Sequence, residues 1–71
     1  MPAELLQIKD HAIFVAVGTN LHIIDFTDFA PVECNGRFVM VEAPIGDLMF
    51  EYSDLTVAVS IASEINDAMT A

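Results

Sequence analysis

Short runs of β-branched and aromatic residues, separated by turn-forming residues, fill most of the chain. Such runs are typical of β-strands, and Gly, Pro, Asn or Asp between them indicate tight turns. The pattern predicts a first strand at His11–Val17, ended by Gly18-Thr19-Asn20, and a second strand at Leu21–Phe26. Asp25-Phe26-Thr27-Asp28 then bends the chain. Successive short strands joined by short turns predict a β-meander.

The dipeptide Asn35-Gly36 is the strongest turn signal in the sequence. Both central positions of a type I′ turn need positive φ, which these two residue types tolerate best. We therefore expect this turn to join a strand at Phe29–Cys34 to a strand at Arg37–Ala43. Pro31 has no amide hydrogen to donate, which favours an edge or irregular position for the first of these two strands.

The C-terminal segment Asp54–Met69 fits two alternatives. After Ser53 or Asp54 as an N-cap, apolar residues recur at helical spacing at Leu55, Ala58, Ala62, Ile65 and Met69. Residues of the same segment also alternate with period two, as in a strand, at Leu55, Val57, Val59 and Ile61. The length of the segment and its Ala and Glu content favour the helix. The opening segment Ala3–Ile8 fits either a strand or a helical turn.

Together these elements predict an α+β fold, a small antiparallel β-meander of about four strands covered on one face by a C-terminal helix. The chain has 71 residues and no linker, repeat or low-complexity tract, so residues 1–71 are expected to form a single domain. A single cysteine, Cys34, excludes an intrachain disulfide framework. A domain this small then needs another source of stability, and homo-oligomerisation is the simplest.

Hairpin register decides which side chains share a face of this sheet. A two-residue loop at Asn35-Gly36 sets Cys34 opposite Arg37. A four-residue loop at Pro44–Asp47 leads into a last strand at Leu48–Tyr52. One face then carries the predicted core residues Val32, Cys34, Val39, Val41, Leu48, Phe50 and Tyr52. The opposite face carries a mixture of aromatic, methionine and carboxylate groups: Phe29, Pro31, Glu33, Phe38, Met40, Glu42, Met49 and Glu51.

This mixed face is the candidate binding surface. Exposed Met and Phe beside carboxylates suit an interface whose partner offers apolar groups together with Lys or Arg. The expected partner-binding residues are Glu33, Phe38, Met40, Glu42, Met49 and Glu51. In the alternative interpretation, the glutamates are a solvated outer face and the apolar residues pack under the chain termini.

No pattern in the chain indicates catalysis or a metal site. His11, His22 and Cys34 lack the paired spacing of metal ligands, and all three glycines are explained by turns rather than by a phosphate-binding loop. Paired carboxylates such as Glu42 and Glu51 suit acid and base chemistry, but a small meander offers little room for a water-excluding pocket. The sequence therefore predicts a protein that is not an enzyme and that uses no cofactor or metal.

Charge and hydrophobicity narrow the class of protein further. The chain has 11 Asp and Glu against 2 Lys and Arg, a net charge of −9, and 55% of its residues are hydrophobic. The acidity argues against direct binding to nucleic-acid phosphates, and the hydrophobicity argues against disorder. No apolar run approaches a membrane span, and the first residues do not resemble a signal peptide, so we expect a cytoplasmic protein. Its excess apolar surface predicts a partner, such as a second copy in a homodimer.

In size, acidity and lack of catalytic motifs, the chain resembles small phage-encoded proteins that block host defence enzymes, anti-CRISPR proteins among them, by occupying a basic nucleic-acid channel. The likeness is one of composition. It implies an inhibitor that docks on a basic, nucleic-acid-binding surface of a partner protein in a bacterial cell or phage-infected host. The alternative is a homo-oligomeric structural or assembly subunit without inhibitory activity, for which the excess hydrophobicity is the reason.

Overall fold

Six strands and one long helix make up the fold of the computed structural model, which describes residues 1–71. The elements are β1 (Pro2–Ile8), β2 (Ala12–Val17), β3 (Asn20–Asp25), the 3-10 turn η1 (Phe26–Asp28), β4 (Glu33–Asn35), β5 (Phe38–Ala43), β6 (Gly46–Glu51) and α1 (Leu55–Thr70). The strands form one sheet in the order β3-β2-β1-β6-β5-β4, in which β1 and β6 run parallel and every other pair is antiparallel. The predicted α+β class is confirmed, but the prediction of about four antiparallel strands is wrong.

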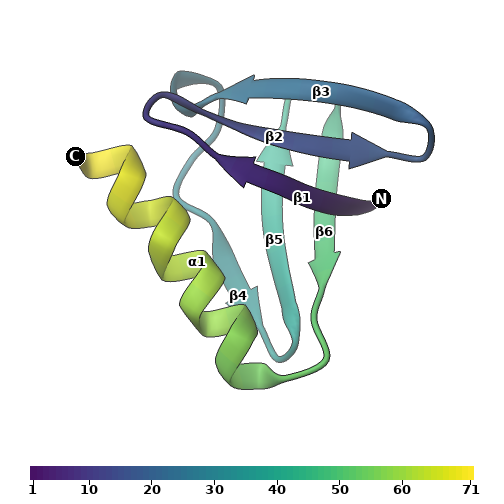
Figure 1. Ribbon diagram of the computed structural model, residues 1–71, viewed down its shortest axis with the longest axis vertical. Coiled ribbons are helices and arrows are strands. Elements are labelled where there is room, and N and C mark those ends of the chain that lie inside the picture. The colour runs from purple at the N-terminus through teal and green to yellow at the C-terminus, as the bar shows by residue number, and fades with distance from the viewer.

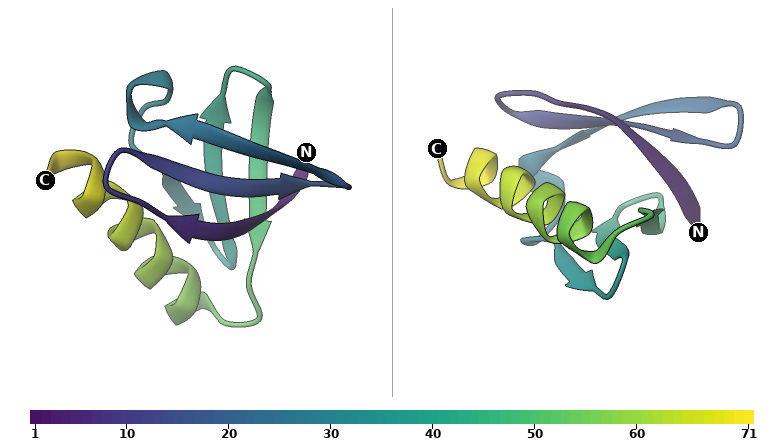
Figure 2. Two further views of the ribbon diagram at one scale, coloured as in Figure 1. Left: turned by 45° about the horizontal axis from the view of Figure 1, so that its top comes forward. Right: turned by 60° about the horizontal axis from the view of Figure 1, so that its bottom comes forward.

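The sheet consists of two three-stranded meanders, β1–β2–β3 and β4–β5–β6, whose strands cross each other (Figure 1). Helix α1 lies diagonally beside both, and the right-hand view of Figure 2 shows the β1–β3 meander above the helix and the other strands. Buried residues from all three parts form one core: Ile13, Val15, Ile24, Phe29, Val32, Val39, Val41, Leu48, Phe50, Ala58, Ala62 and Ile65. No helix of the fold is long and apolar enough to cross a membrane.

Glycine sets the hairpin turns. Gly18 and Gly36 have φ of 62° and 61°, and each is the first residue of a two-residue loop. The predicted Asn35-Gly36 loop is wrong, because the loop is Gly36-Arg37 and Asn35 pairs with Phe38 in the ladder. A type II′ turn needs positive φ only at its first central position, and no residue other than glycine has positive φ here.

The β5–β6 hairpin also has a shorter loop than the sequence predicted. Ala43 pairs with Gly46, so the loop is Pro44-Ile45 rather than a four-residue turn. Each of the two errors shifts the predicted register by two residues. Since side chains alternate with period two along a strand, a shift of two leaves every side chain on its predicted face.

The C-terminal segment is a helix, which resolves the alternatives left by the sequence. The carboxylate of Asp54 accepts a hydrogen bond from the Thr56 N–H at the N-cap. The buried residues of the helix are Ala58, Ala62 and Ile65, and the two small alanines allow α1 to approach the sheet closely. The opening segment, which fitted either a strand or a helical turn, is strand β1.

Two residues do not lie where the sequence placed them. Phe29 was predicted on the mixed outer face, but it is buried and packs edge-on against Phe26, with ring centroids 6.0 Å apart. The chain before β4 is a 3-10 turn and irregular backbone, so the strand alternation does not extend back to Phe29. Cys34 is opposite Val39 on the predicted core face, yet it is exposed because β4 is an edge strand.

Candidate protein-binding surface

The outer face of β4, β5 and β6 brings together all six residues that the sequence predicted as a binding surface. Glu33, Met40 and Met49 form one row across the three strands. Phe38 pairs with Glu51 on one side of that row, and Glu42 pairs with Asp47 on the other. We call this surface the acidic face; it comprises Glu33, Phe38, Met40, Glu42, Asp47, Met49 and Glu51.

Apolar groups occupy the middle of the acidic face and carboxylates surround them. Phe38, Met40 and Met49 are half-buried, whereas every carboxylate of the face is exposed. An apolar centre with a polar, hydrated rim is the usual anatomy of a protein interface. The face lies on antiparallel strands with continuous pairing from Phe38 to Ala43, so its side chains are held in a fixed pattern.

Arg37 reduces the negative charge at one end of the acidic face. Its Nη2 lies 3.4 Å from Oε2 of Glu51, and its guanidinium carbon lies 5.8 Å from the ring centroid of Phe38. Its Nη1 also donates a hydrogen bond to the Tyr52 carbonyl at 3.3 Å. Glu33, Glu42 and Asp47 have no such cation beside them, so the uncompensated charge lies at the β4 side and at the Glu42–Asp47 row.

A small hollow of about 80 Å³ opens beside this uncompensated charge. It is lined by Ala30, Pro31, Glu33, Met40 and Glu42. Two carboxylates next to a thioether and a proline ring match a Lys or Arg side chain, whose apolar stem packs on carbon and sulfur while its charged end meets the carboxylates.

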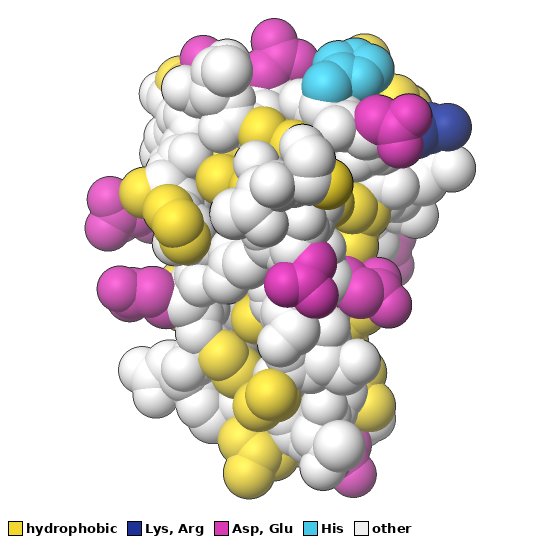
Figure 3. All heavy atoms as spheres, turned by 90° about the vertical axis from the view of Figure 1, so that its left-hand side faces the viewer, with side chains coloured by type: hydrophobic (Ala, Val, Ile, Leu, Met, Phe, Trp, Pro, Cys, Tyr) yellow, Lys and Arg dark blue, Asp and Glu magenta, His cyan; other side chains and the backbone are white.

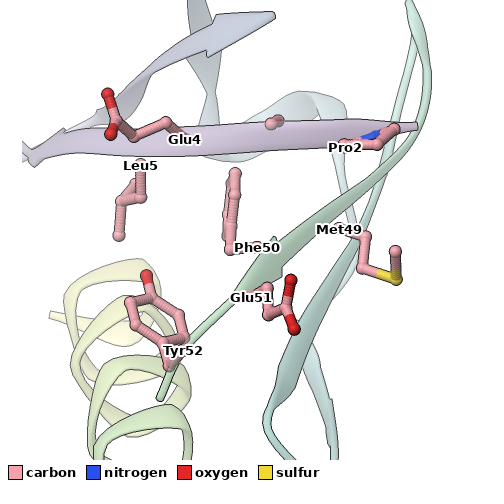
Figure 4. Close-up of a pocket in the computed structure, with 8 residues that line it drawn as sticks. Pro2, Glu4, Leu5, Met49, Phe50, Glu51 and Tyr52 are labelled. Carbon is pink, nitrogen blue, oxygen red and sulfur yellow. The ribbon is translucent and has the colours of Figure 1, made fainter.

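A second, larger cleft lies where β1 and β6 diverge. The two strands pair only through Pro2 with Met49 and Ala3 with Phe50. The cleft beyond these pairs has a volume of about 460 Å³ and is lined by Pro2, Ala3, Glu4, Leu5, Met49, Phe50, Glu51 and Tyr52. Leu5, Phe50 and Tyr52 point into the gap, while Met49 and Glu51 project from the other side of β6 (Figure 4).

The Tyr52 hydroxyl is the polar group inside this cleft. Burial raises the pKa of Tyr52 above its ordinary value, so at neutral pH the phenol is protonated and available as a hydrogen-bond donor. The exposed carboxylates of Glu4 and Glu51 point away from the gap, to the other sides of β1 and β6 (Figure 4). The cleft therefore offers an apolar floor and one hydrogen-bond donor at the border of the acidic face.

The remaining chemistry-bearing residues are dispersed. His22 is on β3 and Cys34 is on β4, which are the two opposite edges of the sheet. No group of three or more His, Cys, Asp or Glu side chains is arranged to hold a metal ion.

Acidic side chains are also spread over the helix side of the molecule, where apolar side chains gather at the end at which α1 begins (Figure 3). Leu55 and Val59 are exposed neighbours, four residues apart in the first turns of α1, and are called the helix patch below.

Sequence reasoning missed several residues of these surfaces. Asp47 has the same alternation as Met49 and Glu51, and it was omitted because it was assigned to the loop. Leu5 and Tyr52 meet at the cleft only because β1 pairs with β6, a contact between distant segments for which the sequence carries no local signal. A scan against protein-family models found no match, and searches of curated proteins and of solved structures found no significant match either.

Proposed function

We propose that this protein is a non-catalytic binding protein that docks its acidic face onto a basic surface of a partner protein. The observation that supports this most is the apolar centre of Phe38, Met40 and Met49, which exposed carboxylates surround. Methionine side chains adapt to the shape of a partner, and the carboxylates select a surface rich in Lys and Arg. The hollow between Glu33 and Glu42 receives one of those cationic side chains.

The proposed outcome of docking is inhibition. Proteins that bind DNA or RNA hold its phosphates with clustered Lys and Arg, and a folded surface of negative charge is steered to the same cluster. A domain with extents of 30 × 25 × 17 Å seated there blocks access by the nucleic acid. The partner is therefore a nucleic-acid-binding protein, and the activity is that of a small anti-defence inhibitor of the phage-encoded kind.

Charge reversal tests the surface. Glu33→Lys/Glu42→Lys inverts the charge around the hollow and avoids Glu51, whose charge is partly compensated by Arg37. The matched control is Glu64→Lys/Asp67→Lys, which changes the net charge equally at exposed positions of α1. The immobilised chain captures proteins from a bacterial lysate, and the purified partner is then titrated by calorimetry at low and high salt.

We expect the control variant to bind like the wild-type chain and the Glu33→Lys/Glu42→Lys variant to bind at least about tenfold more weakly. Affinity should fall as salt increases, and the partner's own nucleic acid should compete for binding. Equal affinity of both variants would exclude the acidic face as the docking surface. A partner that binds the protein and its nucleic acid at the same time would exclude the inhibitory mechanism.

A second candidate function is that of a homo-oligomeric structural or assembly subunit without inhibitory activity. The observation in its favour is the exposure of Leu21 and Ile23 on β3, at 76% and 68%. Absence of any binding to basic partners, together with stable self-association, would favour this function over inhibition.

A further inference from the structure

The two edges of the sheet differ in how well they are protected against pairing with another strand. The β4 edge has only three residues and is preceded by Pro31. The side-chain amide of Asn66 on α1 also bonds both backbone polar groups of Val32, just before β4. Short length, proline and covered backbone groups are the features by which proteins prevent edge-to-edge association.

The β3 edge has none of these features. It is six residues long, pairs with β2 at every position from Asn20 to Asp25 without a bulge, and contains no proline or lysine. In a two-residue hairpin the closing pair exchanges both hydrogen bonds, and bonded and non-bonded pairs then alternate. Counting from the closing pair of Val17 and Asn20, the N–H and C=O groups of Leu21 and Ile23 point away from β2, toward solvent.

The side chains of the same two residues form an apolar surface next to this open edge. Leu21 and Ile23 stand beside Ala16 and Phe14 of β2, respectively. Lys9 lies near this surface, with its Nζ 5.8 Å from the ring centroid of Phe14. The carboxylates nearest in the ladder are Asp25 at the end of β3 and Glu4 on β1, two strands from the edge.

Charge determines which occupant this edge accepts. Two copies of a chain with net charge −9 repel each other, so a contact between them must lie where carboxylates are few. The β3 edge satisfies this requirement, whereas the acidic face does not. An antiparallel ladder between two identical strands is also self-complementary, as a two-fold symmetric interface must be.

We propose that β3 pairs antiparallel with β3 of a second copy about a two-fold axis at His22. In this register Leu21 lies opposite Ile23 of the second copy, and the outward N–H and C=O groups of both residues are satisfied. The two sheets become one continuous sheet, on whose outer face Leu21 and Ile23 of both copies pack side by side. Because β3 and the β4–β6 meander are at opposite ends of the strand order, both acidic faces stay accessible. The inference does not depend on the proposed function.

The oligomeric state tests the surface. Light scattering over a concentration series should give twice the chain mass of 7.7 kDa for the wild-type protein. Ile23→Lys places a charge on the proposed interface, and Val59→Lys is its control on the helix patch, where the native side chain is 49% exposed. We expect Ile23→Lys to weaken the dimer at least about tenfold and Val59→Lys to leave it unchanged.

A disulfide tests the register. In a Cys34→Ser background, which removes the exposed native thiol, His22→Cys places two thiols opposite each other at a non-hydrogen-bonded pair. Cα atoms of such a pair are about 4.5 Å apart, within the range of a disulfide. Mild oxidation should yield a covalent dimer for His22→Cys, while Leu21→Cys, opposite Ile23 of the second copy, should stay largely uncrosslinked.

Three results would overturn the inference. The first is a wild-type chain that remains monomeric at every concentration. The second is a dimer that dissociates with Val59→Lys and persists with Ile23→Lys, which would assign self-association to the helix patch. The third is equal crosslinking of the two cysteine variants, which would exclude this register. Circular dichroism of each variant verifies that it is folded.

Discussion

The side-chain amide of Asn66 makes the two backbone hydrogen bonds with Val32 that a neighbouring strand would otherwise make. The Val32 N–H donates to Oδ1 of Asn66 at 2.8 Å, and Nδ2 of Asn66 donates to the Val32 carbonyl at 3.1 Å. The two residues are 34 positions apart in the sequence. This pair of hydrogen bonds fixes the C-terminal half of α1 to the irregular segment that enters β4, where backbone groups have no strand partner on that side.

Replacing Asn66 should destabilise the fold more than its partial exposure suggests. Asn66→Ala leaves the N–H and C=O of buried Val32 without these partners, at a cost of about 1–3 kcal/mol in the free energy of unfolding. Asn66→Asp keeps an acceptor but loses the donor, so it should also destabilise. Urea unfolding measures both, with the exposed Ser63→Ala as control. A change below about 0.5 kcal/mol for Asn66→Ala would show that water replaces the amide.

The β4–β5 turn should tolerate alanine poorly at Gly36. A Cβ at this position meets no atom within 4 Å, so the penalty comes from the backbone, which has φ of +61°. Gly36→Ala should therefore reduce stability by about 1–2 kcal/mol. Gly36→Asn should cost less, because asparagine tolerates positive φ. Urea midpoints at constant m-value provide the measurement, and equal stability of the two variants would contradict the turn geometry.

Alkaline pH should destabilise the protein through Tyr52. Burial raises the pKa of Tyr52 in the folded state above the ordinary 10.0, so the unfolded chain loses this proton first. The contribution to stability is present below pH 10.0 and is lost as pH rises through the raised folded value. Because the chain has one Tyr and no Trp, tyrosinate absorbance titrates this group alone.

The control for this titration is the chain unfolded in urea, in which Tyr52 should ionise at a lower pH than in the folded protein. Tyr52→Phe should remove this part of the alkaline loss of stability. Identical titration curves for the folded and unfolded chains would contradict the burial of the phenol.

Removing Arg37 should strengthen docking with little effect on folding. Its ion pair with Glu51 joins side chains that are 50% and 60% exposed, and such a surface pair contributes less than about 1 kcal/mol to stability. Arg37→Gln makes the acidic face more negative, so affinity for the basic partner should rise, and more so at low salt. Calorimetry with the partner measures this change. Weaker binding would mean that the guanidinium itself contacts the partner.

Local patterns predicted which residues belong to which face, although they did not predict the register. The loop at Gly36-Arg37 lies one residue later than the expected Asn35-Gly36 loop, and the β5–β6 loop is shorter than expected. Each difference moves the ladder by an even number of residues. Residues within the strands keep their predicted faces because side chains alternate with period two, whereas Phe29, which precedes β4, does not, and Cys34 keeps its face but is exposed.

Contacts between distant segments account for what the sequence did not predict. The parallel pairing of Ala3 with Phe50 depends on the path of the whole chain between them, and no dipeptide or periodicity encodes it. The burial of Phe29 depends in the same way on η1, which turns the chain out of strand geometry before β4. Both the larger cleft and the closure of the core follow from these nonlocal contacts.

The short parallel contact between β1 and β6 also sets an order of events during synthesis. The β1–β2–β3 meander is complete once Asp25 has left the ribosome, but its first strand must wait for Met49 and Phe50 before the two halves of the sheet join. Two residue pairs then hold that junction. A nascent chain therefore exposes a finished three-stranded meander with an apolar inner surface until its second half arrives, and we expect this junction to open before the antiparallel ladders do.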